Sequence, residues 1–166
     1  MIRIRSAPFY TLTATVCDMD ELANMNEGVT HLTLGSNCLN ENSTTYLLFN
    51  ELVYLKELVI GNDSCVNVNQ LYLIDLPKLE SVVIGENCFT KKKNAYGKNP
   101  NRHFCLKDCP KLKELKVGRY SFSDYTVCEI ESVDALEVIE MGRLNYVSCN
   151  FFSASLELKS GRLLKA

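Results

Sequence analysis

A short motif recurs along this chain and limits the folds that the chain can adopt. Five segments read apolar-x-x-apolar-x-apolar-Gly, and they end at Gly35, Gly61, Gly85, Gly118 and Gly142. The steps between these glycines are 26, 24, 33 and 24 residues. A nearly constant period of this length is typical of chains that stack one structural unit on the next. The repeat therefore predicts a solenoid that begins near residue 29.

Each unit contains two stretches in which apolar residues alternate with others. The first stretch is the motif itself, and the second carries the pairs Leu47/Phe49, Leu71/Leu73, Phe104/Leu106, Cys128/Ile130 and Leu156/Leu158. A period of two predicts β-strands. We expect the motif strands to form one parallel inner sheet and the second stretches to be short strands or extended segments on the outer arc. Stacking then places Leu58, Val82, Leu115 and Ile139 above one another.

The best copies of the motif continue past the glycine and read L-x-x-L-x-L-G-x-N-x-L. Asn37, Asp63 and Asn87 follow the glycine by two residues; Leu39, Cys65, Phe89, Phe122 and Tyr146 follow it by four. This pattern resembles the leucine-rich repeat family over roughly residues 29 to 160, and the extended outer segments are most similar to its BspA-like variety. The resemblance implies a mainly β, right-handed solenoid that binds a protein on its concave face and catalyses nothing.

The glycines are expected to bend the chain, and the segments at the two ends of the repeat array are expected to differ from the repeats. Glycine after each inner strand is expected to form a corner, because it tolerates a positive φ. Residues 1–28 break the period and are predicted to be an N-terminal cap, with a strand from Phe9 to Val16 and a short helix through Met25. Residues 29–166 form the solenoid of about five repeats. Residues 161–166 look like a poor cover, so the last repeat is expected to meet a partner or a continuation of the chain.

The composition fits a globular chain without a marked charge bias. Hydrophobic residues make up 46% and the net charge is −2, which predicts neither a nucleic-acid nor a membrane partner. The segment from Pro8 to Val16 is too polar for an export signal, so we expect a cytoplasmic protein whose eight cysteines are reduced. The alternative is a fragment of a surface or secreted adhesion protein, for which the sequons at Asn42 and Asn62 count weakly.

The outward positions of the inner strands are the main candidate binding surface. One predicted row is His31, Glu57, Ser81, Glu114 and Val138; the other is Thr33, Val59, Val83, Lys116 and Glu140. Val59 and Val83 are apolar side chains in the middle of the sheet with charged neighbours. The structural alternative is that valine simply suits a strand. We expect the partner to contact Glu57, Val59, Ser81, Val83, Glu114, Lys116, Val138 and Glu140.

A basic insertion in the third unit is the second candidate. It carries Lys91, Lys92, Lys93, Lys98 and Arg102. Such a run can contact phosphates, which leaves a nucleic-acid binder as a further alternative. We favour a solvated loop, because insertions in repeats usually lie in loops.

Histidine and cysteine do not form a convincing catalytic or metal site in the sequence. The repeat register places His103 and Cys105 outward but Cys109 in the core, so these potential ligands diverge. No phosphate-binding, dinucleotide-binding or serine-hydrolase motif is present. We therefore expect no enzyme, cofactor, metal or small-molecule substrate, and a protein as the partner.

Overall fold

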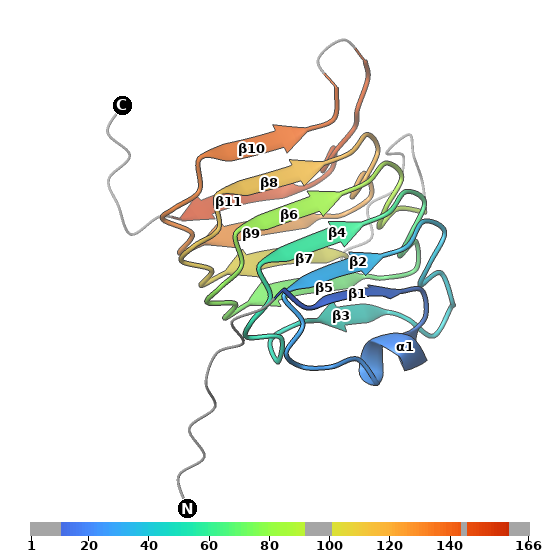
Figure 1. The fold of residues 1–166 in the computed structure, drawn as a ribbon. Coiled ribbons are helices and arrows are strands. Elements are labelled where there is room, and N and C mark those ends of the chain that lie inside the picture. Colours follow the sequence, from blue (N-terminus) through green and yellow to red (C-terminus); the bar gives the residue numbers. More distant parts are fainter. Residues whose placement is uncertain (1–10, 92–100, 144–145, 160–166) are drawn as a thin grey trace, which may run out of the picture.

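The computed structural model describes residues 11–91, 101–143 and 146–159. Their regular secondary structure is mainly strand, and the strands form two parallel sheets (Figure 1). The six-stranded sheet contains β1 (Thr13–Val16), β2 (His31–Leu34), β4 (Glu57–Ile60), β6 (Ser81–Ile84), β8 (Glu114–Val117) and β10 (Val138–Met141). The five-stranded sheet contains β3 (Tyr46–Leu48), β5 (Gln70–Ile74), β7 (His103–Lys107), β9 (Val127–Glu131) and β11 (Ser155–Lys159).

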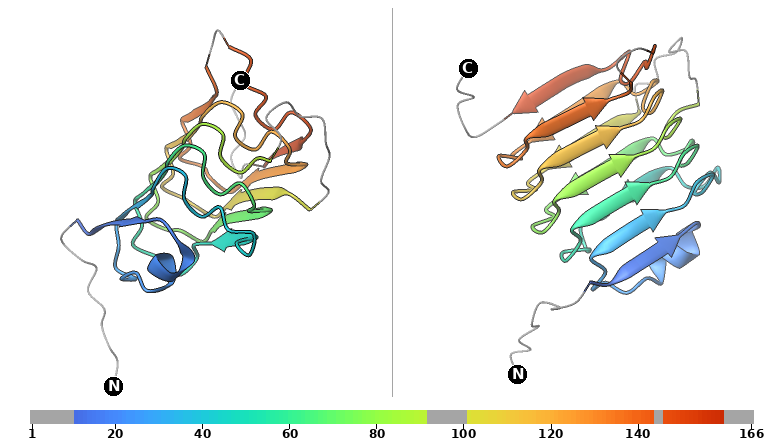
Figure 2. Two further views of the ribbon diagram at one scale, coloured as in Figure 1. Left: turned by 90° about the vertical axis from the view of Figure 1, so that its right-hand side faces the viewer. Right: turned by 45° about the horizontal axis from the view of Figure 1, so that its top comes forward.

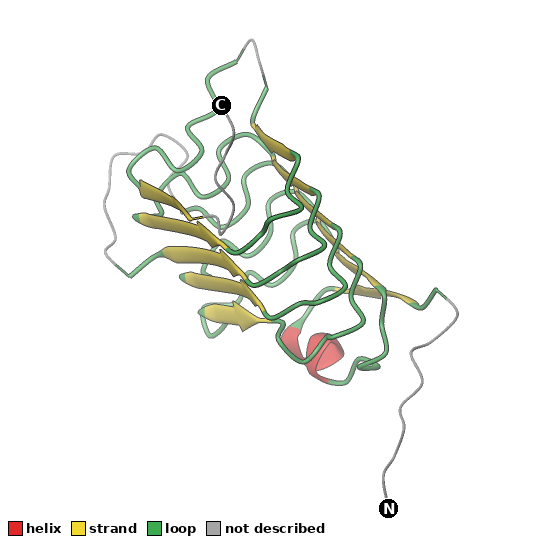
Figure 3. Ribbon diagram, turned by 90° about the vertical axis from the view of Figure 1, so that its left-hand side faces the viewer, coloured by secondary structure: helices red, strands yellow, loops and turns green. Residues whose placement is uncertain are grey.

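From β2 onward the chain passes alternately from one sheet to the other. Each time the chain re-enters a sheet, the new strand pairs with the strand that the chain formed in that sheet one turn before. Neighbouring strands are therefore parallel (Figure 2). The two sheets face each other across a common interior (Figure 3). The motif strands and the second apolar stretches therefore both form strands, as the period of two predicted.

Alternation decides which side chains fill that interior. The even-numbered residues of β2, Leu32 and Leu34, are buried, and their register partners Leu58 and Ile60 in β4 are buried in the same way. The predicted stack continues through Val82, Leu115 and Ile139. Burying a side chain of this size contributes roughly 1.5–3 kcal/mol, so the shared interior is the main source of stability.

A separate stack in the interior is formed by the residues four positions after each of the first four motif glycines, and it contains aromatic rings. Phe89 stacks on Phe122 with ring centroids 4.7 Å apart, and Phe122 stacks on Phe151 at 4.8 Å. The prediction that Tyr146 is the last member is wrong, since Tyr146 is exposed and Phe151 occupies the place. The bend after Gly142 is five residues longer than the bends after the earlier glycines. Positive φ falls at Cys149 and Phe151, where the earlier spacing of two and four residues expects it near residues 144 and 146.

The glycines do not act as predicted. Among the described glycines only Gly142 has a positive φ. The residues two and four positions after the earlier glycines have a positive φ instead, for example Asn37 and Leu39. A Cβ added at Gly61 would lie 2.5 Å from Ser36 N, and one at Gly118 would lie 2.5 Å from Gly85 C. Glycine is required because successive turns approach closely here, and the turn itself is made by other residues.

The N-terminal cap is only partly as expected. Helix α1 (Met19–Ala23) is capped by Asp18, whose Oδ1 accepts a hydrogen bond from Glu21 N at 2.8 Å. It ends two residues before the predicted Met25. The predicted strand is shorter as well and starts at Thr13 within the described residues. β1 pairs with β2 in register, so residues 13–16 continue the six-stranded sheet although the sequence motif does not reach them.

The other end of the two sheets is apolar and open among the described residues. Ile139 stays in register with the buried Leu115 but is 42% exposed, because no further described strand covers it. Leu156 and Leu158 of β11 are 63% and 49% exposed for the same reason. The prediction that these three residues belong to the core is therefore wrong for the structure described.

Candidate functional site

The outward face of the six-stranded sheet brings the predicted binding residues together. His31, Glu57, Ser81, Glu114 and Val138 are successive register partners, and so are Thr33, Val59, Val83, Lys116 and Glu140. Side chains of both rows are half-buried or exposed, whereas the residues between them on each strand are mostly buried. The sequence therefore predicted correctly which side chains share this face and in which order.

Apolar and charged side chains occupy different parts of this face. Val59 and Val83 are register partners at its centre, next to Thr33. Lys116 and Glu140 continue the same row toward the exposed end, while Glu57 and Glu114 lie in the other row. The face thus combines a small β-branched patch with a mixed-charge border.

Several of the polar side chains are already paired on the surface. Ser81 donates a hydrogen bond to Glu114 Oε1 at 2.8 Å, and Lys116 Nζ lies 3.2 Å from Glu114 Oε2. The hydrogen bond from Ser81, followed by the one from Lys116, lowers the pKa of Glu114. His31 Nε2 lies 3.8 Å from Glu57 Oε2. These pairs hold charged groups in place while leaving them accessible to a partner.

Two hollows open on the part of this face nearest the exposed end. One has a volume of about 320 Å³ and lies among Ser81, Lys113, Glu114 and Val138. The other, of about 200 Å³, lies between Lys116 and Arg143, where Arg143 pairs with Glu86 at 3.1 Å. Their linings are largely charged, so they can receive polar side chains of a partner.

Arg102 does not belong to an accessible basic loop, and that prediction is wrong. The side chain is fully buried, and its Nη2 atom donates to the carbonyl oxygens of Val66, Val68 and Phe89 at 3.0–3.1 Å. The guanidinium therefore satisfies carbonyl groups in the interior and is not available to bind a phosphate. Lys91 is exposed, and Lys92, Lys93 and Lys98 lie outside the described residues.

The cysteines and His103 follow the predicted register, with one correction. His103 and Cys105 are half-buried on the outward face of β7, and Cys109 is buried. Cys17 and Cys38 form a disulfide, so the expectation that all eight cysteines are reduced is wrong. Within the described ranges, no group of three or more His, Cys, Asp or Glu side chains is placed to hold a metal ion.

The buried thiols are poor nucleophiles. Burial is the largest cause of the raised pKa of Cys88 and Cys109, about 11 in each case, and of Cys128, about 12. Burial likewise raises the pKa of the half-exposed Cys105 thiol, and the neighbouring Glu129 carboxylate raises it further. A catalytic cysteine needs the opposite shift, because the thiolate is the reactive form.

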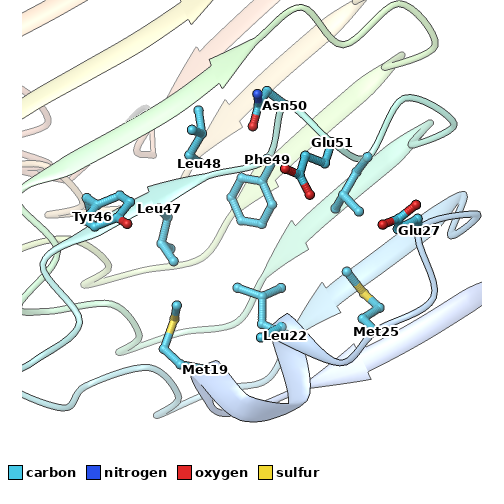
Figure 4. Close-up of a pocket in the computed structure, with 12 residues that line it drawn as sticks. Met19, Leu22, Met25, Glu27, Tyr46, Leu47, Leu48, Phe49, Asn50 and Glu51 are labelled. Atoms are coloured by element: carbon cyan, nitrogen blue, oxygen red, sulfur yellow. The ribbon is translucent and has the colours of Figure 1, made fainter.

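A second surface lies at the N-terminal end and was missed from the sequence. A groove of about 360 Å³ separates α1 from β3 (Figure 4). Met19, Leu22 and Met25 line it from the side of α1; Leu47 and Phe49 line it from the side of β3. The signal in the sequence is the run Tyr46-Leu47-Leu48-Phe49, which is apolar on both faces of a strand instead of one.

Comparison of the chain with protein-family models, with curated proteins and with solved structures found no match. In the part of the chain that the structure describes, no helix has the length and apolar character needed to cross a bilayer.

Proposed function

We propose that this chain is a leucine-rich-repeat solenoid of the BspA-like kind and that it binds a protein partner without catalysing a reaction. The support for the architecture is the coincidence of the sequence period with the strand register: each copy of the motif supplies one strand of the six-stranded sheet. The binding surface in this proposal is the outward face of that sheet.

One observation carries the proposal of a binding face. Val59 and Val83 lie side by side at the centre of a surface whose other apolar member is Val138 near its end, and their side chains remain partly accessible. The surrounding charges of Glu57, Glu114 and Lys116 give a partner both an apolar contact and groups that fix its orientation. A small apolar centre with a polar border is the usual composition of a protein interface.

The chemistry of the described residues agrees with a role other than catalysis. Cys105 shares the outward face of β7 with His103, yet burial and the Glu129 carboxylate raise the pKa of its thiol, so the thiol is protonated at neutral pH. A thiol becomes a catalytic nucleophile when a neighbouring base or a lowered pKa makes the thiolate available, and the pKa shift of Cys105 is in the opposite direction.

Two matched double variants test this proposal. V83D with K116E alters the outward face of the six-stranded sheet; V127D with K107E makes the same two changes on the outward face of the five-stranded sheet. Both lysines form surface ion pairs of similar length, 3.2 Å for Lys116 with Glu114 and 3.5 Å for Lys107 with Glu131. The control therefore removes one lysine, adds two carboxylates and breaks one surface ion pair, as V83D/K116E does.

The measurement is affinity purification from the source organism followed by mass spectrometry, with circular dichroism to verify that each variant is folded. We expect proteins captured by the unmodified chain and by V127D/K107E to be absent from V83D/K116E. Equal capture by both folded variants would place the binding surface elsewhere.

A fragment of a secreted or cell-surface adhesion protein is a second candidate, favoured by the Cys17–Cys38 disulfide. Disulfides persist mainly in oxidising compartments. Thiol titration of protein from its source, denatured without reductant, separates the candidates. Six free thiols support an oxidised location, and eight support a reducing one.

A further inference from the structure

We propose that the free edge of β3 and the groove beside it bind an extended segment of a partner protein in which apolar and basic side chains alternate. This surface lies at the N-terminal end of the molecule and is distinct from the outward face of the six-stranded sheet. Three independent features lead to it: an unpaired strand edge, an apolar groove and a local excess of negative charge.

The unpaired edge arises because the two sheets differ by one strand. β1 extends the six-stranded sheet beyond β2, but the chain between β1 and β2 forms α1 where the alternation of sheets would place another strand. β3 is consequently the end of the five-stranded sheet, and among the described strands it pairs on one side only, with β5. Helix α1 has five residues and none of them is buried, so it covers this end incompletely.

The backbone of β3 can accept another strand. Gln70 N donates to Thr45 O, and in a parallel ladder the groups of alternate residues point to opposite sides. The N–H and C=O groups of Tyr46 and Leu48 are therefore directed away from β5, toward the free edge. An extended peptide satisfies such groups by adding a strand, which a helix cannot do.

The groove supplies an apolar surface for alternate side chains of that peptide. Leu22 of α1 and Met25 just after it are partly exposed and form one wall of the groove (Figure 4). Leu47 of β3 and Phe49 just after it line the opposite side, where they are only 2% exposed and form its floor. Tyr46 and Leu48 are 59% and 49% exposed on the other face of the same strand. Because side chains of a strand alternate between two faces, an added strand would place apolar residues against one or both of these surfaces.

The charge of the surface around the groove predicts which polar side chains the bound peptide carries. Residues 11–55 contain no lysine or arginine, and their acidic residues are Asp18, Asp20, Glu21, Glu27, Glu41 and Glu51. Two of these, Glu27 and Glu51, line the groove itself. The whole chain has a net charge of only −2, so the acidity is concentrated at this end. Lysine or arginine in the peptide complements it.

The test uses fluorescence anisotropy with a labelled peptide of alternating valine and lysine. A peptide of alternating valine and glutamate, and one with the same valines and lysines grouped in two blocks, serve as ligand controls. We expect saturable binding of the alternating valine–lysine peptide only, weakened by added salt because the charges are exposed.

The affinity of variants of the full chain for this peptide shows where the peptide binds. L48P removes an N–H group on the free edge while leaving the ladder to β5 intact, and E27K/E51K reverses the charge of the groove. E80K/E137K makes the same charge change at exposed positions elsewhere. We expect at least tenfold weaker binding for L48P and for E27K/E51K, and less than a twofold change for E80K/E137K. Equal affinities in all folded variants would overturn the proposal.

Two other occupants give different results in the same experiments. Residues 2–5 of this chain, Ile-Arg-Ile-Arg, have the alternation expected of the ligand. If R3E/R5E strengthens peptide binding more than tenfold, this segment is the occupant and the partner proposal is wrong. If sedimentation shows a dimer that E27K/E51K dissociates, a second copy is the occupant, and the partner proposal is equally wrong. A negative result in any of these peptide-binding experiments does not bear on the proposal that the outward face of the six-stranded sheet binds a protein.

Discussion

Arg102 Nε lies 3.4 Å from Asp124 Oδ1, and both side chains are buried in the interior between the two sheets. The same carboxylate accepts a hydrogen bond from Lys91 N through its Oδ2 atom at 3.2 Å. Asp124 therefore contacts the described residues on both sides of the insertion that interrupts the third repeat. The guanidinium also lies 4.9 Å from the ring centroid of Tyr125, whose hydroxyl donates to Val68 O. This cluster joins three successive turns of the chain.

Replacing Arg102 by methionine should lower the free energy of unfolding by about 3–5 kcal/mol, because it leaves Asp124 as a buried charge without its partner. Three carbonyl oxygens lose their donor at the same time. Urea unfolding followed by circular dichroism measures the change. The control is K91M, an exposed lysine on the other side of the insertion, which should alter stability by less than about 0.5 kcal/mol. Similar values for the two variants would show that the ion pair is unimportant.

The close approach of successive turns predicts the effect of adding one methyl group. Gly61→Ala would place Cβ 2.5 Å from Ser36 N, so the backbone must shift, at a cost of about 1–3 kcal/mol. Gly28→Ala meets only side-chain atoms, Asn26 Oδ1 at 3.1 Å and Leu12 Cδ2 at 3.9 Å, and should leave stability nearly unchanged. Thermal unfolding of both variants tests this difference. A melting temperature equal to that of the unmodified chain for G61A would contradict the stacking explanation of the glycine repeat.

The aromatic stack predicts a large difference between two nearby phenylalanines. Phe122 is fully buried and its ring lies between those of Phe89 and Phe151, so Phe122→Ala should cost about 3–5 kcal/mol. Phe152 is 69% exposed, and its replacement by alanine should have little effect. Denaturant unfolding of the two variants provides the comparison. A larger loss for F152A than for F122A would mean that the last turn is packed differently.

The buried thiols predict that the protein becomes less stable in alkali. Burial raises the pKa of Cys128 from 9.0 to about 12, which means that the folded state keeps a proton that the unfolded state releases. This contribution is complete below pH 9.0 and is lost as the pH rises toward about 12. Each pH unit in that window removes about 1.4 kcal/mol per thiol.

Urea unfolding at several pH values between 8 and 11 tests this dependence in the unmodified chain and in C128A. The variant should start less stable because it loses a buried group, but its stability should fall less steeply with pH. Parallel slopes would exclude Cys128 from the alkaline transition.

Strands and register could be predicted because both depend on local periodicity. The motif placed His31, Glu57, Ser81 and Glu114 in one row, and the structure has them as register partners. The role of Arg102 could not be predicted in this way. A basic residue next to a lysine-rich segment looks solvated in sequence. Only the carbonyl groups of Val68 and Phe89, together with Asp124, make its burial favourable.

The amino-acid sequence alone determined the alternation of buried and outward side chains, because a period of two assigns each residue of a strand to one face. Three other features depend on the tertiary structure. The glycines are required by contacts between turns, Phe151 replaces Tyr146 because the bend after Gly142 is longer, and β3 keeps a free edge because α1 takes the place of a strand. Each of these depends on neighbours that are distant along the chain, and a local pattern contains no information about them.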